Sequence, residues 1–209
     1  MTVSDLPHWL EFAREIQALS QTGLTYAEDY YAVQRYQRFM EIAAEIVEGY
    51  TRLAKEPLLE NFLIQPGYAT PKIDVRGAVI RDNKILLVQE KTDERWAMPG
   101  GWADVGDIPS EMVAREVWEE SGFKVEARKV IAVFDANRSG RPMHFYHAYK
   151  IVFLCHILSG HPRPSEETLA VDFFPFDNLP PLSSERTNER HLNEIQAHLR
   201  DPQRPAAFD

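Results

Sequence analysis

Cysteine is almost absent from this chain of 209 residues, whose one thiol belongs to Cys155. A single cysteine excludes an internal disulfide, and its place in the apolar run 151–158 predicts a small buried core residue rather than a reactive thiol. The chain also lacks any apolar run of about 18 residues, the length that a membrane-spanning helix requires. Its first residues show no basic stretch followed by an apolar one, as a secretory signal would. These absences predict a reduced, cytoplasmic setting.

Positive charge is the next deficit, because 23 Lys and Arg face 32 Asp and Glu and give a net charge of -9. An acidic chain binds a phosphate backbone poorly, so we expect no extended nucleic-acid footprint. A single nucleotide can still bind if a metal ion supplies the positive charge. Core material is plentiful, since 44% of residues are hydrophobic and 11% aromatic, which excludes a disordered chain. The length suits one domain, with or without a small appendage.

The N-terminal third is patterned as helix. Apolar residues recur at three- and four-residue steps in Trp9, Phe12, Ala13, Ile16 and Leu19. Gly23 should break this helix, and Thr25 with Glu28 forms a capping-box pattern for a second helix that ends near Tyr50. A short third helix is expected over 58–64. Helices this short bury their apolar stripes poorly on one another, which predicts packing against a second copy or against the rest of the chain. An add-on that only stabilises the monomer is the open alternative.

A linker at 65–71, marked by two prolines and a glycine, separates this part from a region of strand patterning. We therefore expect a helical N-terminal domain over 1–66 and a second domain over 67–209. Strands are predicted over 73–79, 84–89, 130–135, 144–158 and 171–176, with a turn at Asp82–Asn83. Helical patterning returns over 109–121 and 187–199. This order predicts an α/β fold in which helices cover a mixed sheet.

The segment 104–120 carries the chemistry, because six carboxylates face one cation, Arg115, and leave a local charge of -5. The six are Asp104, Asp107, Glu111, Glu116, Glu119 and Glu120. The last three share one face of a helix at positions i, i+3 and i+4. Mg²⁺ and Mn²⁺ prefer such oxygen ligands. A solvated acidic face is the plainer interpretation, but the flanking apolar residues and the preceding Gly-Gly turn favour a metal site.

These residues resemble the Nudix box. The matching positions are Gly101, Arg115, Glu116, Val117, Glu119, Glu120, Gly122 and Phe123. One position departs from the pattern, since Asp107 stands where the family has glutamate. A pattern with this many fixed positions is specific, and the resemblance extends over 71–199. The helical segment in front and the box entrance 96–106 resemble a subgroup that includes bacterial CDP-choline pyrophosphatases and ADP-ribose pyrophosphatases.

The resemblance implies a Nudix α/β/α sandwich with a mixed sheet, preceded by a small all-helical domain. It implies a Mg²⁺-dependent pyrophosphohydrolase, with Mn²⁺ as the alternative ion, that cleaves a nucleoside diphosphate linked to a group X. CDP-choline is the first expected substrate and ADP-ribose the second, and the products are a nucleoside monophosphate and phosphorylated X. Two alternatives stay open: an RNA-end or 3′-nucleotide hydrolase, and a non-catalytic nucleotide-sugar sensor. The subgroup also implies a homodimer.

The resemblance assigns roles within the box. Glu116, Glu119 and Glu120 would hold the metal, with the backbone carbonyl of Gly100 as a further ligand, and Arg115 would orient a helix carboxylate. The general base would come from a loop before the last strand, where Glu166 and Glu167 lie, unless neither of them serves.

Outside the helix we single out candidates for substrate contact. Arg76 and Arg138 are candidates for phosphate binding, with ordinary surface charge as the alternative. Gly101 and Trp102 lie at the box entrance, where the indole could stack on a base or join the core. His144 could touch substrate, but it cannot chelate zinc together with His147, because residues i and i+3 of a strand face opposite ways.

Overall fold

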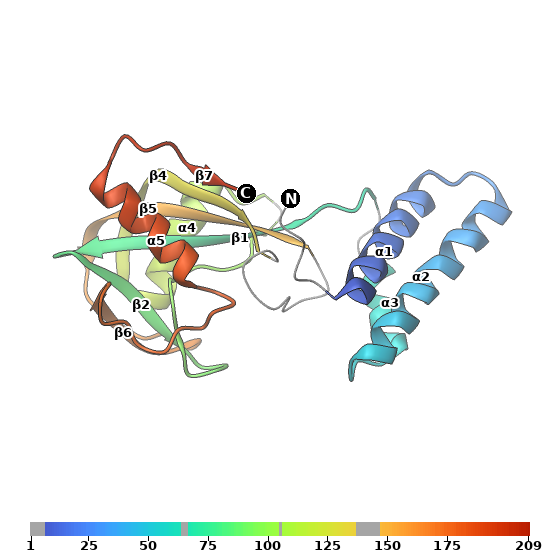
Figure 1. Cartoon of the computed structure of the whole chain (residues 1–209), viewed down its shortest axis with the longest axis horizontal. Coiled ribbons are helices and arrows are strands. Elements are labelled where there is room, and N and C mark those ends of the chain that lie inside the picture. Colours follow the sequence, from blue (N-terminus) through green and yellow to red (C-terminus); the bar gives the residue numbers. More distant parts are fainter. Residues whose placement is uncertain (1–6, 64–66, 105, 137–146) are drawn as a thin grey trace. The chain divides into compact units, whose positions relative to one another are not determined.

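The computed structural model of the protein describes residues 7–63, 67–104, 106–136 and 147–209. It divides the chain into two compact units, of which one comprises Met1–Pro71 and the other begins at Lys72 (Figure 1). The sequence boundary expected at 66/67 lies in the same connection, between the last helix of the first unit and the first strand of the second. The expected α/β class with a helical N-terminal region is confirmed.

The first unit contains α1 (His8–Tyr26), α2 (Tyr30–Tyr50) and α3 (Lys55–Leu63). Two expectations are wrong here. Gly23 does not end α1, and its missing side chain instead makes room for the ring of Tyr36, which a Cβ would overlap. Thr25 does not cap α2, because its hydroxyl donates to the Gln21 carbonyl within α1. The N-cap is Asp29, whose carboxylate accepts from the Ala32 amide at 2.8 Å.

The core of the helical unit consists of small and medium apolar side chains. Its buried members are Ala13, Met40, Ala43, Ala44, Val47, Leu58 and Phe62. Other members of the predicted stripe stay exposed within the described residues, with Phe12 at 56% and Leu19 at 63% of their full exposure. The helical unit therefore leaves apolar surface uncovered.

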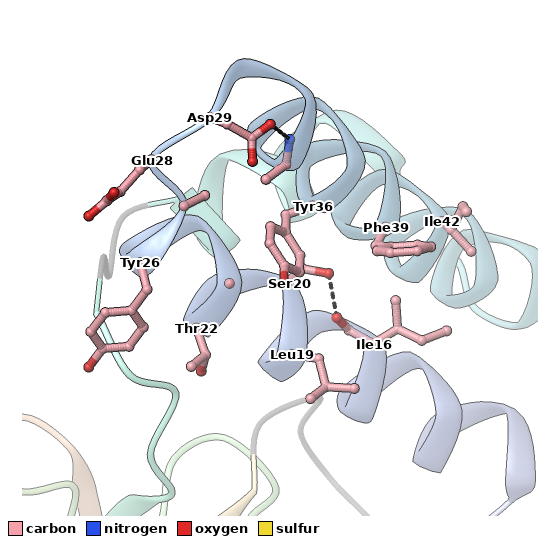
Figure 2. A pocket seen from close by; sticks show the side chains of 13 residues that line it. Ile16, Leu19, Ser20, Thr22, Tyr26, Glu28, Asp29, Tyr36, Phe39 and Ile42 are labelled. Atoms are coloured by element: carbon pink, nitrogen blue, oxygen red, sulfur yellow. Dashed lines mark hydrogen bonds between the residues drawn. The ribbon is translucent and has the colours of Figure 1, made fainter.

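Part of this surface is a groove of about 1100 Å³ between α1 and α2. Figure 2 shows Ile16 and Leu19 from α1 and Tyr36, Phe39 and Ile42 from α2 around it. Its polar end is closed by the α1–α2 connection, where Asp29 caps α2. The groove is thus mostly apolar, with carboxylates at one end only.

The second unit is built on one mixed sheet. Its strands are β1 (Lys72–Arg81), β2 (Lys84–Glu90), β3 (Trp96–Ala97), β4 (Phe123–Asp135), β5 (Ala148–Gly160), β6 (Thr168–Pro175) and β7 (Ala207–Phe208). The strand order is β3-β2-β1-β5-β4-β7, and β6 pairs with β2. The pairs β1–β5 and β4–β7 are parallel, and the others are antiparallel.

Helices α4 (Pro109–Ser121) and α5 (Glu189–Arg200) cover opposite faces of this sheet (Figure 1). Alternation along β2 sends Leu86 into the core under α4 and Leu87 into the core under α5. The predicted sandwich is confirmed. Cys155 lies in the α4-side core, where burial raises the pKa of its thiol to about 12, as expected for an inert core residue.

Most element predictions hold, and the misses have local causes. The turn at Asp82–Asn83 has the positive φ values of 52° and 56° that a tight hairpin requires. The last helix begins two residues later than expected because Asn188 is its N-cap. The sequence patterns did not predict the two-residue strands β3 and β7. They also did not predict the first half of β4, where the exposed positions are charged. The predicted start of β5 at 144–146 lies outside the described residues. None of the described helices is long and apolar enough to cross a membrane.

Candidate active site

Helix α4 positions the predicted metal-binding carboxylates. Pro109 starts it with a fixed φ, and Gly122 ends it in the left-handed conformation at φ 79°. The apolar side of the helix packs on the sheet. Of its three predicted ligands, Glu120 is buried, Glu116 is half-buried and Glu119 is exposed. The three carboxylates thus pass from the protein interior to solvent along one face.

Glu120 is the buried end of this series, at 8% of its full exposure. Its Oε2 accepts a hydrogen bond from the Gly100 amide at 3.0 Å. Burial raises the pKa of Glu120 to about 8, and the negative charges of Glu90 and Glu116 raise it further. The charge of Arg76 and the hydrogen bond from the Gly100 amide lower this pKa but do not outweigh burial. Glu116 has a raised pKa as well, first by burial and also through Glu119 and Glu167. These carboxylates repel one another in a place with little water.

The turn at Gly100–Gly101 is held beside the helix by β1. The Val75 amide donates to the Gly101 carbonyl and the Gly77 amide to the Pro99 carbonyl, both at 2.9 Å. Gly100 has φ 142°, and a Cβ there would overlap the Val75 carbonyl oxygen. A Cβ at Gly101 would lie 3.1 Å from Oε2 of Glu116. Both glycines therefore give the backbone close access to the carboxylates.

Gly100→Ala is expected to destabilise the fold by about 1–3 kcal/mol, because an L side chain is strained at this φ and collides with β1. The displaced amide would also leave Glu120 without its hydrogen bond. Urea unfolding checks the effect, with Gly49→Ala in α2 as the matched control, since a Cβ at Gly49 meets nothing within 4 Å. An unchanged unfolding midpoint for Gly100→Ala would show that the turn adapts freely.

Arg115 binds two carboxylates. It forms a bidentate pair with Asp107 at 3.0 and 3.1 Å and a longer contact of 3.4 Å with Glu116 on its own helix. The hydrogen bonds from Arg115 lower the pKa of Asp107. Asp107, the residue that departs from the box pattern, thus anchors the arginine beside Glu116.

Arg76 lies inside the protein, so the alternative prediction that it is an ordinary surface charge is wrong. Its guanidinium pairs with Asp74 at 2.9 and 3.0 Å and donates to the Met98 carbonyl at 3.2 Å. With 5% of its surface exposed and all three nitrogens engaged, it is also badly placed to bind a phosphate directly. Arg76 instead fixes the backbone just before Gly100 and places a positive charge near Glu120.

The sequence missed two members of this buried network, Asp74 and Lys150. The Lys150 Nζ lies 4.0 Å from Asp74 and donates to the carbonyls of Glu185 and Arg186 at 3.0 and 2.8 Å. Burial would raise the pKa of Asp74, but the charges of Arg76 and Lys150 outweigh it and hold this pKa below its ordinary value. Both are charged residues within strands that are otherwise largely apolar, and this pattern could have indicated a buried ion pair.

Glu90, at the end of β2, is another residue that the sequence missed. It is 8% exposed and pairs with Arg186 at 3.3 Å. Burial raises the pKa of Glu90, and the charges of Asp93 and Glu167 raise it further. The positive charges of Arg186 and Arg76 lower it but do not outweigh burial. The charge of Glu90 in turn raises the pKa of Glu120. Glu90 therefore lies within electrostatic reach of the α4 carboxylates.

The two candidates for the general base are both exposed, just before β6. The Lys91 amide donates to the Glu167 carbonyl at 3.1 Å, and the Lys91 ammonium donates to the Glu166 carbonyl. The charge of Glu167 acts on both Glu116 and Glu90. This coupling favours Glu167 over Glu166 as the carboxylate nearer the centre.

Three candidates for substrate contact remain. Trp102 is 45% exposed, and its backbone forms an isolated antiparallel bridge with Asp74 at the box entrance. An exposed indole leaves stacking open and excludes a place in the core. Arg138 and His144 lie outside the described residues.

The donors of the centre are carboxylates and backbone groups, which suit a hard divalent cation such as Mg²⁺ or Mn²⁺ rather than zinc. Over the described ranges, no three His, Cys, Asp or Glu side chains converge as ligands of one ion. Closing on an ion would therefore require side-chain rotation, which the exposed Glu119 and half-buried Glu116 allow. An ion would also offset the burial and the mutual repulsion that together raise the pKa of Glu116 and Glu120. The residues present fit a divalent cation by their chemistry.

Comparison with known proteins agrees with this geometry. The family model of the NUDIX domain matches residues 71–195, and that of the UDP-X-like, N-terminal oligomerisation domain matches residues 7–62. A Bacillus subtilis (strain 168) protein, provisionally named an ADP-ribose pyrophosphatase, is 41% identical over 201 residues, which cover 96% of this chain and 97% of that protein.

Two solved structures are similar as well. The crystal structure of a UDP-X diphosphatase is 31% identical, has a TM-score of 0.63, and the match covers 97% of this chain and 98% of that one. An ADP-ribose pyrophosphatase from Streptococcus suis 89-1591 is 38% identical, has a TM-score of 0.62, and the match covers 67% of this chain and 100% of that one.

The sandwich fold and its carboxylate helix define a hydrolase of the Nudix class. The chain belongs to the Nudix family, as an ADP-ribose pyrophosphatase/UDP-X diphosphatase-like hydrolase with a UDP-X-like oligomerisation domain before its NUDIX domain. The resemblance read from the box and from the helical segment is confirmed. Nudix hydrolases generally use divalent cations and act on small molecules.

Proposed function

We propose that the protein is a Mg²⁺-dependent pyrophosphohydrolase that cleaves ADP-ribose or a similar nucleoside diphosphate derivative to a nucleoside monophosphate and phosphorylated X. The observation that carries this proposal is the pair Glu116 and Glu120, held half-buried and buried beside the Gly100–Gly101 turn. Carboxylates in such a place are costly unless a cation joins them. The names of the similar proteins put ADP-ribose or a UDP derivative before CDP-choline, the first substrate expected from the sequence.

The position of each side chain supports the following roles. Glu116, Glu119 and Glu120 would hold the cation, which when bound would neutralise the diphosphate and lower the pKa of a water. Arg115, anchored by Asp107, keeps Glu116 oriented. Glu167 would accept the proton of the attacking water, since it is exposed and coupled to Glu116. Trp102 would stack on the base.

A substrate panel tests the choice of X. It would contain ADP-ribose, UDP-glucose, CDP-choline, NAD-capped RNA and dinucleoside polyphosphates, each with Mg²⁺ and with chelator. We expect metal-dependent release of a nucleoside monophosphate, with ADP-ribose or the UDP derivative turned over best. Preference for CDP-choline would restore the order expected from the sequence, and preference for capped RNA would favour the RNA-end hydrolase. Tight binding without turnover of any compound would favour the sensor.

We also propose that the protein is a homodimer joined through its helical unit. The apolar groove between α1 and α2 supports this (Figure 2), as do the exposed Phe12 and Leu19 and the oligomerisation domain that matches this segment. Apolar side chains that become buried at the centre of an interface usually contribute much of its binding free energy.

Leu19→Glu is expected to weaken the dimer by at least about 10-fold, because it places a charge in an apolar contact. Sedimentation equilibrium measures the change, and Gln37→Glu, which adds the same charge at an exposed polar position of α2, is the matched control. A wild-type protein that sediments as a monomer at micromolar concentration would remove the dimer proposal.

A further inference from the structure

The pairing of β2 with β6 contains an irregularity next to the α4 carboxylates. Gln89 pairs with Ala170, but Glu90 pairs with Thr168, so Leu169 is an extra residue on β6. A bulge of this kind redirects side chains, and bulges are frequent beside active sites. Here it places Thr168 opposite Glu90 and turns its hydroxyl toward α4, where it donates to the Glu120 carbonyl at 3.1 Å.

Alternation along β2 places Glu90 on the α4 side of the sheet. Leu86 packs in the core under α4, and Glu90 lies four residues further along the same strand, hence on the same face. Its partner Thr168 contacts the backbone of Glu120. Glu90 and Glu120 also share the charge of the buried Arg76, which acts on both carboxylates. Glu90 is therefore part of the same carboxylate group, although it lies outside the Nudix box.

Glu90 is held there by Arg186. The Arg186 Nε lies 3.3 Å from Oε1 of Glu90, while its other nitrogens donate to Thr92 and Ser183 at 3.1 Å. The backbone of Arg186 is fixed in turn, since its carbonyl accepts a hydrogen bond from Lys150. The pair is thus braced between the β2–β3 connection and the segment before α5.

We propose that Glu90 is a further carboxylate of the divalent-cation centre and raises the affinity of the centre for its ion by its negative charge, which the paired Arg186 offsets in part. This inference rests on the proposed function. A buried carboxylate next to the ligands favours a bound cation even where it does not touch the ion, and second-layer partners of this kind typically change metal affinity by about 10- to 100-fold. If the pair only braced the loops, removing either partner would have the same effect.

The experiment is a titration of Mn²⁺ into the full-length, nucleotide-free protein, with free Mn²⁺ measured by electron paramagnetic resonance. Glu90→Gln, which keeps size and removes charge, is expected to weaken Mn²⁺ binding by about 10-fold or more. Glu90→Asp should recover part of the affinity. Arg186→Gln should leave the affinity equal or tighter, because it removes a cation. Glu111→Gln, at an exposed position of α4, is the control for loss of one acidic charge.

Weaker Mn²⁺ binding by Glu90→Gln, together with equal or tighter binding by Arg186→Gln, would support the inference. Equal affinity of Glu90→Gln and wild type would overturn it, as would equal weakening by both variants together with a matching loss of thermal stability. A wild-type protein that binds no Mn²⁺ would instead remove the proposed function itself, so the two failures are distinguishable.

Discussion

Glu120→Gln is expected to lower turnover by about 10²- to 10³-fold and, in the absence of metal, to raise the thermal unfolding temperature. The loss of turnover follows from the ion, since a bound cation contributes several kcal/mol to the transition state and each 1.36 kcal/mol is a factor of ten. The gain in stability follows from burial. Glutamine keeps an oxygen to accept the Gly100 hydrogen bond, but needs neither the desolvation of a charge nor the uptake of a proton that the raised pKa of Glu120 requires on folding.

Glu119→Gln is the matched comparison, because it removes the same charge one residue earlier at an exposed position. It should reduce turnover without raising stability. The measurements are initial rates with Mg²⁺ and thermal unfolding in chelator, where about 1 kcal/mol corresponds to roughly 2–4 °C for a chain of this size. A fall in both activity and stability for Glu120→Gln would mean that this carboxylate serves the fold and not the reaction.

Asp74→Asn is expected to lower the free energy of unfolding by about 3–5 kcal/mol, the usual cost of breaking a buried ion pair from one side. Asp74 is the carboxylate that faces both Arg76 and Lys150, at 2.9 and 4.0 Å, and all three are nearly inaccessible to solvent. Asparagine would leave two buried cations without that counter-charge. Because Arg76 fixes the Met98 carbonyl beside the Gly100 turn, activity should fall as well.

The penalty for Asp74→Asn should depend on pH. Burial lowers the pKa of Lys150 to about 8. The folded protein therefore loses this proton at a lower pH than the unfolded chain does, and the free energy of unfolding rises with pH above about 8. Losing Asp74 lowers this pKa further, so the penalty should be smaller at about pH 9 than at about pH 6. Denaturant unfolding at both pH values measures it.

Two further variants control this prediction. Lys150→Met in the Asp74→Asn background should recover part of the loss, because one buried cation is removed. Glu126→Gln breaks an exposed pair with Arg128 and should cost no more than about 1 kcal/mol. An Asp74→Asn variant as stable as wild type would show that the buried charges are neutralised in some other way.

The sequence predicts the α4 end of the site well because short-range rules determine it. Pro109, Gly122 and the spacing of Glu116, Glu119 and Glu120 specify a helix, its ends and one acidic face without reference to the rest of the fold. The hairpin turn at Asp82–Asn83 follows from the same kind of local rule.

The missed residues depend on long-range pairing. Alternation along β2 places Glu90 on the α4 face, but its pairing with Thr168, which contacts Glu120, depends on a bulge in β6. Such a register cannot be deduced from the spacing of one strand. Asp74 and Lys150 meet because β1 and β5 pair in parallel, with Asp74 directly beside Lys150. Arg76 resembles a surface cation in the sequence until that pairing buries it.

In the helical unit, local rules competed with one another. Thr25 and Glu28 fit a capping box, and Asp29 fits an N-cap equally well. The hydroxyl of Thr25 bonds within α1, so Asp29 becomes the cap. Gly23 is tolerated inside a helix because the Tyr36 ring fills the space above it.

Phosphorus NMR of ADP-ribose can follow its hydrolysis by the metal-free protein, then after addition of Mg²⁺, and finally after addition of excess chelator. We expect no reaction at first, release of AMP and ribose 5-phosphate once Mg²⁺ is present, and arrest of the reaction on chelation. Hydrolysis that begins without metal and ignores the chelator would contradict the assignment of the α4 carboxylates as a divalent-cation centre.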